Sequence, residues 1–285
     1  MLEDPRRHGQ SDAAARHPPE AAAVNGRQRG SSPLQGRVAV VTGAATGLGL
    51  GIAERFVADG CVEVHGLDIT PTPDRVVPGL QHRTVDVGDA QEVDDCVEAI
   101  LTAAGRIDIL VCNAAIMQDR HEVLQTPDEL VERVLRVNFG GVFNLCRAVG
   151  RAMKDAGSGR VVTVSSQVAE TPWPGMAVYA ASKAAVTTFT RAFALEMAPY
   201  GVYVNTILPG TMDTNQMRDS FAGLGRMTGA DPESLIAAKR TSMPLGRMGT
   251  PQDAANLASW LASDQASFSI GGVFDLTGGE LWSRS

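Results

Sequence analysis

The chain has 285 residues, long enough to bury a large core, and 44% of them are hydrophobic, as in soluble globular proteins. Its formal net charge of −7 argues against a nucleic-acid backbone or an anionic membrane as a partner. No uncharged apolar stretch is long enough to span a membrane, and no secretory signal is visible. The four cysteines lie far apart, which argues against a zinc site and favours a reducing compartment, so we expect a cytoplasmic protein without a bound metal.

Residues 1–36 are rich in Ala, Pro, Gly, Arg and Ser and almost lack large apolar side chains. Five arginines against four acidic residues leave this stretch nearly neutral. A segment of this composition cannot bury enough apolar surface to fold. We therefore predict a disordered tail over 1–36 and a single folded domain over 37–285.

The folded part opens with a β-branched run at 37–42, which predicts a buried strand. A glycine-rich turn at 43–49 follows directly, and an amphipathic helix comes after it. In this context the glycines allow the backbone to approach a pyrophosphate, and the helix N-terminus supplies free N–H groups and a positive partial charge. The pattern indicates a nucleotide-binding turn.

The second strand, predicted at 62–67, ends at Asp68, 19 residues after Gly49. This is close to the spacing at which an acid accepts hydrogen bonds from the adenosine ribose hydroxyls. A carboxylate there repels a 2′-phosphate, and no Arg or Lys lies in the glycine turn or immediately after Asp68. Both facts favour NAD over NADP, although Asp is also common at the start of a simple turn.

Two further strands, predicted at 81–87 and 107–112, bring Asp86 and the run Asn113 to Ala115 to strand ends. Small residues after a strand indicate either close approach to a ligand or a plain tight turn. Thr126 and Pro127 predict the start of a helix over 126–150. That helix would carry Asn138, a poor helix-interior residue, which indicates a packing or functional reason for it.

The fifth strand, predicted at 160–164, ends at Ser165 and Ser166, and a helix is expected over 177–199. Tyr179 and Lys183, four residues apart, would share one face of it. A neighbouring ammonium favours phenolate. Lowering the phenol pKa from ~10 to ~7 requires roughly 4 kcal/mol, and such a Tyr could exchange a proton near neutral pH. The alternative is a half-buried aromatic beside a solvated lysine.

The sixth strand, predicted at 203–208, leads to Pro209 and Gly210, and a helix at 251–261 and a strand at 273–276 complete the pattern. Between them, the Met-rich stretch 211–246 is interpreted as a mobile substrate lid, with simple packing as the alternative. Strands and helices alternate throughout, which predicts an α/β fold: a Rossmann-like, doubly wound parallel sheet of seven strands with helices on both faces. The motifs all follow strands and should meet in one cleft.

Together these motifs resemble those of the short-chain dehydrogenase/reductase family over residues 36–279. The sequence TGAATGLG at 42–49 is similar to the family's cofactor turn, and Ser166 precedes Tyr179 by the 13 residues that the family pattern expects. Two residues depart from the pattern, Ala115 and Ala169, each standing where Gly is usual. The resemblance implies a catalytic set of Asn138, Ser166, Tyr179 and Lys183. It implies cofactor contacts from Gly43, Thr46, Gly47, Leu48, Gly49, Asp68, Asp86, Val87, Asn113, Ala114, Ala115, Tyr179, Lys183, Pro209, Gly210, Met212 and Thr214.

The resemblance also implies a mechanism, in which a hydride passes between nicotinamide and a substrate carbon. Tyr179 would be the general acid or base, Lys183 would lower its pKa and hold the nicotinamide ribose, and Ser166 would bind the substrate oxygen. Asn138 would position a water between Lys183 and solvent. Family members are usually dimers or tetramers that assemble through the two long helices and the C-terminal segment, so we expect the same here.

We expect the walls of the substrate pocket to be formed by Gln118, Gln167, Trp173 and Met176, together with the lid. Because no cluster of Arg or Lys stands out in sequence near the Tyr179 loop, we expect an uncharged or weakly polar secondary alcohol or ketone, cyclic ones included. An NADPH-dependent 3-oxoacyl-carrier reductase is the sibling alternative, and Asp68 argues against it. A nucleotide sensor without chemistry and a structural scaffold are the alternatives from other classes.

Overall fold

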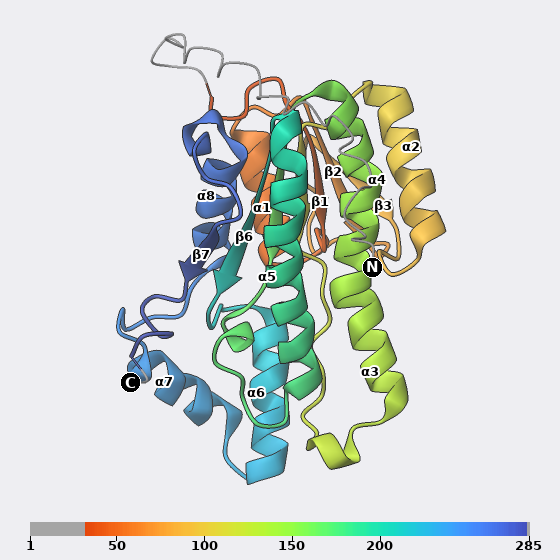
Figure 1. Ribbon diagram of the computed structural model, residues 1–285. Coiled ribbons are helices and arrows are strands. Elements are labelled where there is room, and N and C mark those ends of the chain that lie inside the picture. Colours follow the sequence, from red (N-terminus) through yellow and green to blue (C-terminus); the bar gives the residue numbers. More distant parts are fainter. Residues whose placement is uncertain (1–31, 284–285) are drawn as a thin grey trace, which may run out of the picture.

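The computed structural model describes residues 32–283 and contains a seven-stranded, fully parallel sheet with the strand order β3-β2-β1-β4-β5-β6-β7 (Figure 1). The predicted α/β doubly wound fold is confirmed. The strands are β1 Val38–Thr42, β2 Glu63–Asp68, β3 Leu80–Thr84, β4 Ile109–Cys112, β5 Gly159–Val164, β6 Val202–Pro209 and β7 Val273–Leu276. The helices are α1 Gly47–Ala58, α2 Ala90–Ala104, α3 Asp128–Leu135, α4 Gly141–Ala156, α5 Ala177–Met197, α6 Asn215–Thr228, α7 Pro232–Ser242 and α8 Pro251–Ala262.

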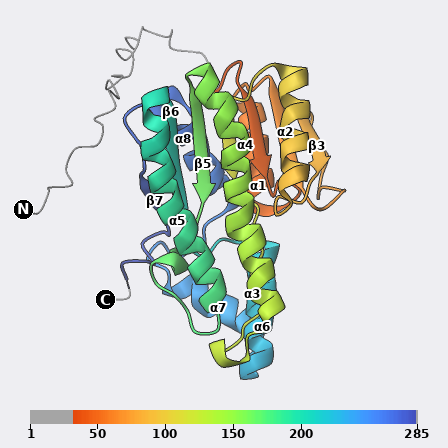
Figure 2. The ribbon, with the colours of Figure 1, turned by 45° about the vertical axis from the view of Figure 1, so that its right-hand side comes forward.

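The sheet separates two apolar cores. Helices α2, α4 and α5 cover one face, while α1 and α8 pack together over the other (Figures 1 and 2). The central strands β1, β4 and β5 are buried along their whole length, as expected for parallel strands that are covered on both faces. Within residues 32–283, no helix combines the length and apolarity needed to cross a membrane.

The order of the strands reverses between β1 and β4, because the chain runs from β1 outward to β3 and then returns to the other side of β1. In open parallel sheets a ligand crevice forms at this reversal, outside the carboxyl ends of the strands. Helices α6 and α7, within the predicted lid, lie beyond those ends (Figure 1). They pack on a small apolar cluster of their own, formed by Met217, Phe221, Ile236, Met243 and Met248.

The predicted helix over 126–150 differs in the structure. Helix α3 begins at Asp128, and the Thr126 hydroxyl donates to the Glu122 carbonyl instead of capping the helix. A π-helical segment, Arg136–Gly140, separates α3 from α4 and carries Asn138. Such single-turn expansions are frequent at functional sites. The Asn138 side chain faces the interior here because its amide binds backbone groups outside the helix.

The folded domain begins before residue 37. Leu34 is fully buried among Ile52, Phe56 and other residues of the α1–α8 core, and its N–H donates to the Asp59 carbonyl at 3.0 Å. Residues 32–36 therefore belong to the domain, because Leu34 is a large apolar side chain that fills core volume. The rest of the predicted tail, 1–31, lies outside the described residues.

We expect Leu34→Ala to lower the free energy of unfolding by about 2–5 kcal/mol, because it leaves a cavity in the α1–α8 core. Val62, which is 62% exposed, provides the control, and Val62→Ala should change stability by no more than about 0.5 kcal/mol. Urea titration of both variants measures the difference. Equal stabilities for the two variants would contradict the placement of Leu34.

Candidate active site

A cavity of about 460 Å³ opens at the carboxyl ends of the central strands. It extends from Asp68 and Asp86 at one end to Met176 and Tyr179 at the other. Most of the residues proposed from the sequence line it: Gly43, Thr46, Gly47, Leu48, Asp68, Asp86, Val87, Asn113, Ala114, Ala115, Ser166, Gln167, Trp173, Met176, Tyr179, Lys183, Pro209, Gly210, Met212 and Thr214. The proposed residues that do not line it are Gly49, Gln118 and Asn138.

The turn after β1 and the turn after β4 are bonded to each other. The Thr42 hydroxyl accepts hydrogen bonds from the backbone N–H groups of Asn113 and Ala114, both at 3.0 Å, and Asn113 Nδ2 donates to the Thr42 carbonyl at 2.9 Å. A Cβ on Gly49 would lie 2.1 Å from the Gly43 carbonyl oxygen. Gly49 is therefore required for this close packing, which explains why it does not reach the cavity.

The N-terminus of α1 lies at the cavity wall without a side-chain cap. The Thr46 side chain makes no capping hydrogen bond within the described chain, and the first turn of α1 holds no acidic residue. Gly43 and Gly47 adopt positive φ angles of 66° and 54°, which favour glycine. Free N–H groups and a positive helix end beside a cavity fit the pyrophosphate of a dinucleotide.

Two carboxylates, Asp68 and Asp86, line the end of the cavity opposite Met176 and Tyr179. Asp68 accepts hydrogen bonds from the N–H groups of Ala45 and Thr70, at 3.0 and 2.9 Å, so its position relative to the glycine turn is fixed. Asp86 lies just past the end of β3 and forms a 2.8 Å ion pair with Arg136. The sequence reasoning missed Arg136, because nothing local pairs it with a residue 50 positions away.

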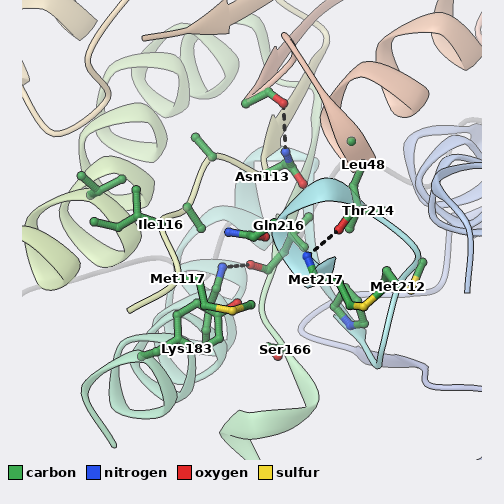
Figure 3. A pocket seen from close by; sticks show the side chains of 18 of the residues that line it. Leu48, Asn113, Ile116, Met117, Ser166, Lys183, Met212, Thr214, Gln216 and Met217 are labelled. Atoms are coloured by element: carbon green, nitrogen blue, oxygen red, sulfur yellow. Dashed lines mark hydrogen bonds between the residues drawn. The ribbon is translucent and has the colours of Figure 1, made fainter. Parts of the chain in front are cut away.

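Ser166, Tyr179 and Lys183 meet at the end of β5. Lys183 Nζ donates to the Val164 carbonyl at 2.8 Å and lies 5.8 Å from the centre of the Tyr179 ring. Figure 3 shows Lys183 and Ser166 in the same cavity as Met212 and Thr214. The neighbouring Ser165 instead bonds the Lys183 carbonyl and the Thr187 hydroxyl, both at 2.8 Å, which leaves Ser166 as the serine of the site.

The pKa values of this pair differ from the expectation. Burial raises the pKa of Tyr179 to about 12, although the hydrogen bond with Ser166 opposes the shift. Burial also lowers the pKa of Lys183 to about 8. The net lowering of the phenol pKa that we expected is absent in this structure, because loss of water around the phenol raises its pKa by more than the hydrogen bond with Ser166 lowers it. The site holds a protonated phenol, which can donate a proton to a carbonyl oxygen.

Gln118 and Asn138 support the site from behind the cavity wall. Gln118 Oε1 accepts the Tyr179 backbone N–H at 2.6 Å and its Nε2 donates to the Gly175 carbonyl, so this side chain caps the start of α5 and is not a substrate wall. Asn138 binds both backbone groups of Ile116 and the Ser182 hydroxyl. Within the described residues its hydrogen bonds do not include Lys183.

The end of the cavity near Tyr179 has apolar walls from Val168, Met176 and Phe221. Two cations from distant segments flank the Trp173 ring: the Arg120 guanidinium carbon and Lys239 Nζ lie 5.8 and 5.2 Å from its centre. The fold brings both basic residues to Trp173 from segments distant in the sequence, so the residues around the Tyr179 loop alone do not indicate them. Lys239 is paired with Glu280.

Comparison with known proteins places these features in a family. The family described as short chain dehydrogenase matches residues 37–224. A 3beta-hydroxysteroid dehydrogenase 1 from Eggerthella lenta is 37% identical over 259 residues, covering 86% of this chain and 94% of the relative. A 3-oxoacyl-[acyl-carrier-protein] reductase from Thermotoga maritima is 33% identical over 253 residues, covering 86% and 98%. The structure of NAD+-bound xylitol dehydrogenase has a TM-score of 0.80 and 27% identity, covering 86% and 99%.

Replacing Lys183 by Met should stabilise the chain at neutral pH. Because burial lowers the lysine pKa from 10.5 to about 8, the folded state carries the full cost of the charge below pH 8, where both states are protonated. Above pH 10.5 both states are neutral and the cost is gone. We expect the free energy of unfolding of Lys183→Met to exceed that of wild type by on the order of 1–3 kcal/mol at pH 7. This difference should shrink towards pH 10.5.

Urea titrations of wild type and Lys183→Met at pH 7, 9 and 10.5 measure that gap. A difference that is the same at all three pH values would show that the ammonium's burial is not its cause.

Proposed function

The chain belongs to the short-chain dehydrogenase family, and on that premise we propose that it transfers a hydride between NAD and a secondary alcohol or ketone. One observation carries the proposal. Ser166, Tyr179 and Lys183 line the same cavity as the uncapped, glycine-rich start of α1. A protein that only sensed a nucleotide, or served as a scaffold, would have no need of that set of groups beside the nucleotide turn.

The choice of NAD rests on Asp68. Its carboxylate lines the cavity at the end of β2, and its two bonds to backbone N–H groups leave lone pairs for ribose hydroxyls. A 2′-phosphate there would meet a negative charge. Asp68 makes no ion pair with Arg or Lys within residues 32–283, so nothing beside it neutralises that charge.

The chain's own residues divide the proton chemistry among them. A nicotinamide held in this cavity would supply the hydride donor or acceptor. Tyr179 donates a proton to a substrate carbonyl oxygen during reduction and accepts one from the alcohol during oxidation. Ser166 holds that oxygen. Asn138 lies behind the cavity wall, where it would orient a water between Lys183 and solvent.

The apolar walls support a weakly polar substrate, cyclic alcohols included. The charge of Lys239 is balanced by Glu280, which leaves Arg120 as the cation to consider beside Trp173. The second candidate function is an NADPH-dependent 3-oxoacyl-carrier reductase, which the Thermotoga maritima relative favours and Asp68 opposes.

An absorbance assay of NADH formation tests the proposal. We expect oxidation of at least one alcohol from a panel of cyclohexanol, xylitol and a 3β-hydroxysteroid, with NAD at least about tenfold better than NADP in kcat/KM, which corresponds to about 1.4 kcal/mol. Acetoacetyl-CoA with NADPH tests the second candidate. A preference for that pair would replace the first proposal with the second.

Tyr179→Phe is the control for the chemistry. It should leave NADH affinity within about twofold and remove turnover, because phenylalanine keeps the ring and lacks the exchangeable proton. Near-normal turnover in this variant would contradict the role of Tyr179.

We also propose a homodimer or homotetramer, located in the cytoplasm, where thiols stay reduced. The four cysteines form no disulfide within residues 32–283. An aromatic cluster crosses the outer sides of α4 and α5, in which Phe189 stacks on Phe193 at 5.6 Å and Phe143 packs at 6.0 Å. Phe143 and Leu195 remain 42% and 74% exposed. Exposed apolar surface of this kind is typical of an interface.

Gel filtration with light scattering measures the assembly. We expect an even-numbered assembly for wild type and a smaller species for Phe143→Asp, because a charge would be buried without a partner at the interface. Val76→Asp, at a 90% exposed loop position, is the control and should assemble as wild type does. A monomeric wild type at micromolar concentration would overturn the proposal.

A further inference from the structure

Glu280, in the segment that follows β7, places a carboxylate inside the protein, where its residue is only 3% exposed. Its Oε1 accepts a hydrogen bond from Gln167 Nε2 at 3.0 Å and pairs with the Lys239 ammonium. Its Oε2 accepts from the Thr211 hydroxyl at 3.0 Å and from the Thr211 backbone N–H at 3.4 Å. One side chain therefore holds three segments that are far apart in the sequence.

Two of these partners belong to the cavity wall. Gln167 follows Ser166 directly, and Thr211 lies between Gly210 and Met212. The same C-terminal segment reaches Gly210 a second time, since the Gly210 N–H donates to the Leu276 carbonyl at 3.1 Å. A Cβ on Gly210 would lie 2.8 Å from Thr277 Cα, so the two strands of chain are in direct contact.

The third partner, Lys239, belongs to α7. Its ammonium also lies 5.2 Å from the centre of the Trp173 ring, which lines the cavity. The Lys239 side chain is 12% exposed, so both charges of the pair are largely withdrawn from water. Separating α7 from Glu280 would leave a buried carboxylate without its countercharge, which is strongly unfavourable.

The ionisation state of Glu280 agrees with this arrangement. Burial by itself would raise the pKa of the carboxyl, but the Lys239 ammonium and the donors Gln167 and Thr211 outweigh it and hold the pKa below its usual value. The carboxylate is thus charged at neutral pH and accepts from all its partners. Because it can only accept, it also fixes the Gln167 amide with its Nε2 towards Glu280.

We propose that Glu280 and Lys239 are positioning residues, which join α7 to the two loops, 166–167 and 210–212, that bound the nicotinamide and substrate end of the cavity. This inference rests on the proposed function for the identity of that end. Glu280 touches neither the glycine turn nor Asp68 among the bonds named above. Its influence should therefore fall on the nicotinamide half of the cofactor and leave the adenosine half unaffected.

The test compares binding of NADH with binding of ADP-ribose, which lacks the nicotinamide, in the full-length chain by calorimetry. Glu280→Gln keeps the shape and removes the charge, and Lys239→Met removes the partner. Asp275→Asn is the matched control, because that carboxylate belongs to the same C-terminal stretch but, among residues 32–283, accepts side-chain hydrogen bonds from the Thr277 N–H and the Trp282 indole and none from Gln167, Thr211 or Lys239. Hydrogen exchange of peptides spanning 166–171 and 211–246 is measured on the same variants.

We expect Glu280→Gln to weaken NADH binding fivefold or more, to leave ADP-ribose binding within twofold, and to speed exchange in both peptides. Lys239→Met should speed exchange in 232–242 most, and Asp275→Asn should match wild type. Equal weakening of NADH binding and ADP-ribose binding would overturn the inference, because Glu280 would then support the whole cofactor site and not its nicotinamide half. A folded variant with unchanged NADH affinity and unchanged lid exchange would also overturn it.

If Glu280→Gln does not fold, Lys239→Met decides by the same measurements. Failure of the proposed function shows separately, as a wild type that binds neither ligand. In that case the exchange data still decide whether Glu280 holds α7 to the loops: faster exchange in Glu280→Gln supports the tie, and unchanged exchange overturns it.

Discussion

The Lys183 ammonium lies in the interior and donates to a single backbone carbonyl, that of Val164 at the end of β5. No carboxylate within residues 32–283 forms an ion pair with it. An ammonium buried in this way lowers stability, and burial shifts its pKa to about 8. The surrounding structure must hold it in place. Helix α5, 21 residues long, carries Lys183 and packs against β6 and the segment after Ser166, which fixes the geometry of the whole site.

The cavity separates electrostatic binding from chemistry along its length. At the end with Asp68 and Asp86, carboxylates and free helix N–H groups face the cavity, where the proposed dinucleotide would place its strongly polar ribose and pyrophosphate. At the other end, a phenol, a hydroxyl and an ammonium lie among apolar walls, where each hydrogen bond acts in a medium of low polarity. The locked turns of Thr42 and Asn113 join the two halves and fix their spacing.

The sequence was sufficient to predict the fold, the order of the strands along the chain and much of the cavity wall, because most motifs follow an apolar run and parallel strands align their carboxyl ends. The strand predicted at 81–87 ends three residues earlier, at Thr84, so Asp86 and Val87 lie in the loop beyond it. The strand β7, Val273–Leu276, was predicted to the residue. The features that could not be predicted from the sequence depend on contacts between residues far apart in the chain. The pKa of Tyr179 follows from burial by the whole fold, the roles of Gln118 and Glu280 from partners 61 and 113 residues away, and the burial of Leu34 from helices that come later in the chain. Local periodicity contains none of this information.

The capping of α5 by Gln118 has a consequence for how this scaffold can change. The backbone N–H of Tyr179 is held by a side chain from the loop after β4, and the same loop contributes Met117 to the cavity wall. Under the proposed function, this short peptide would link substrate selectivity to the position of the proton donor. Exchange of that peptide between homologues would change the hydrogen bond that positions the Tyr179 backbone. A new substrate preference gained in this loop would therefore come with a change in the position of Tyr179.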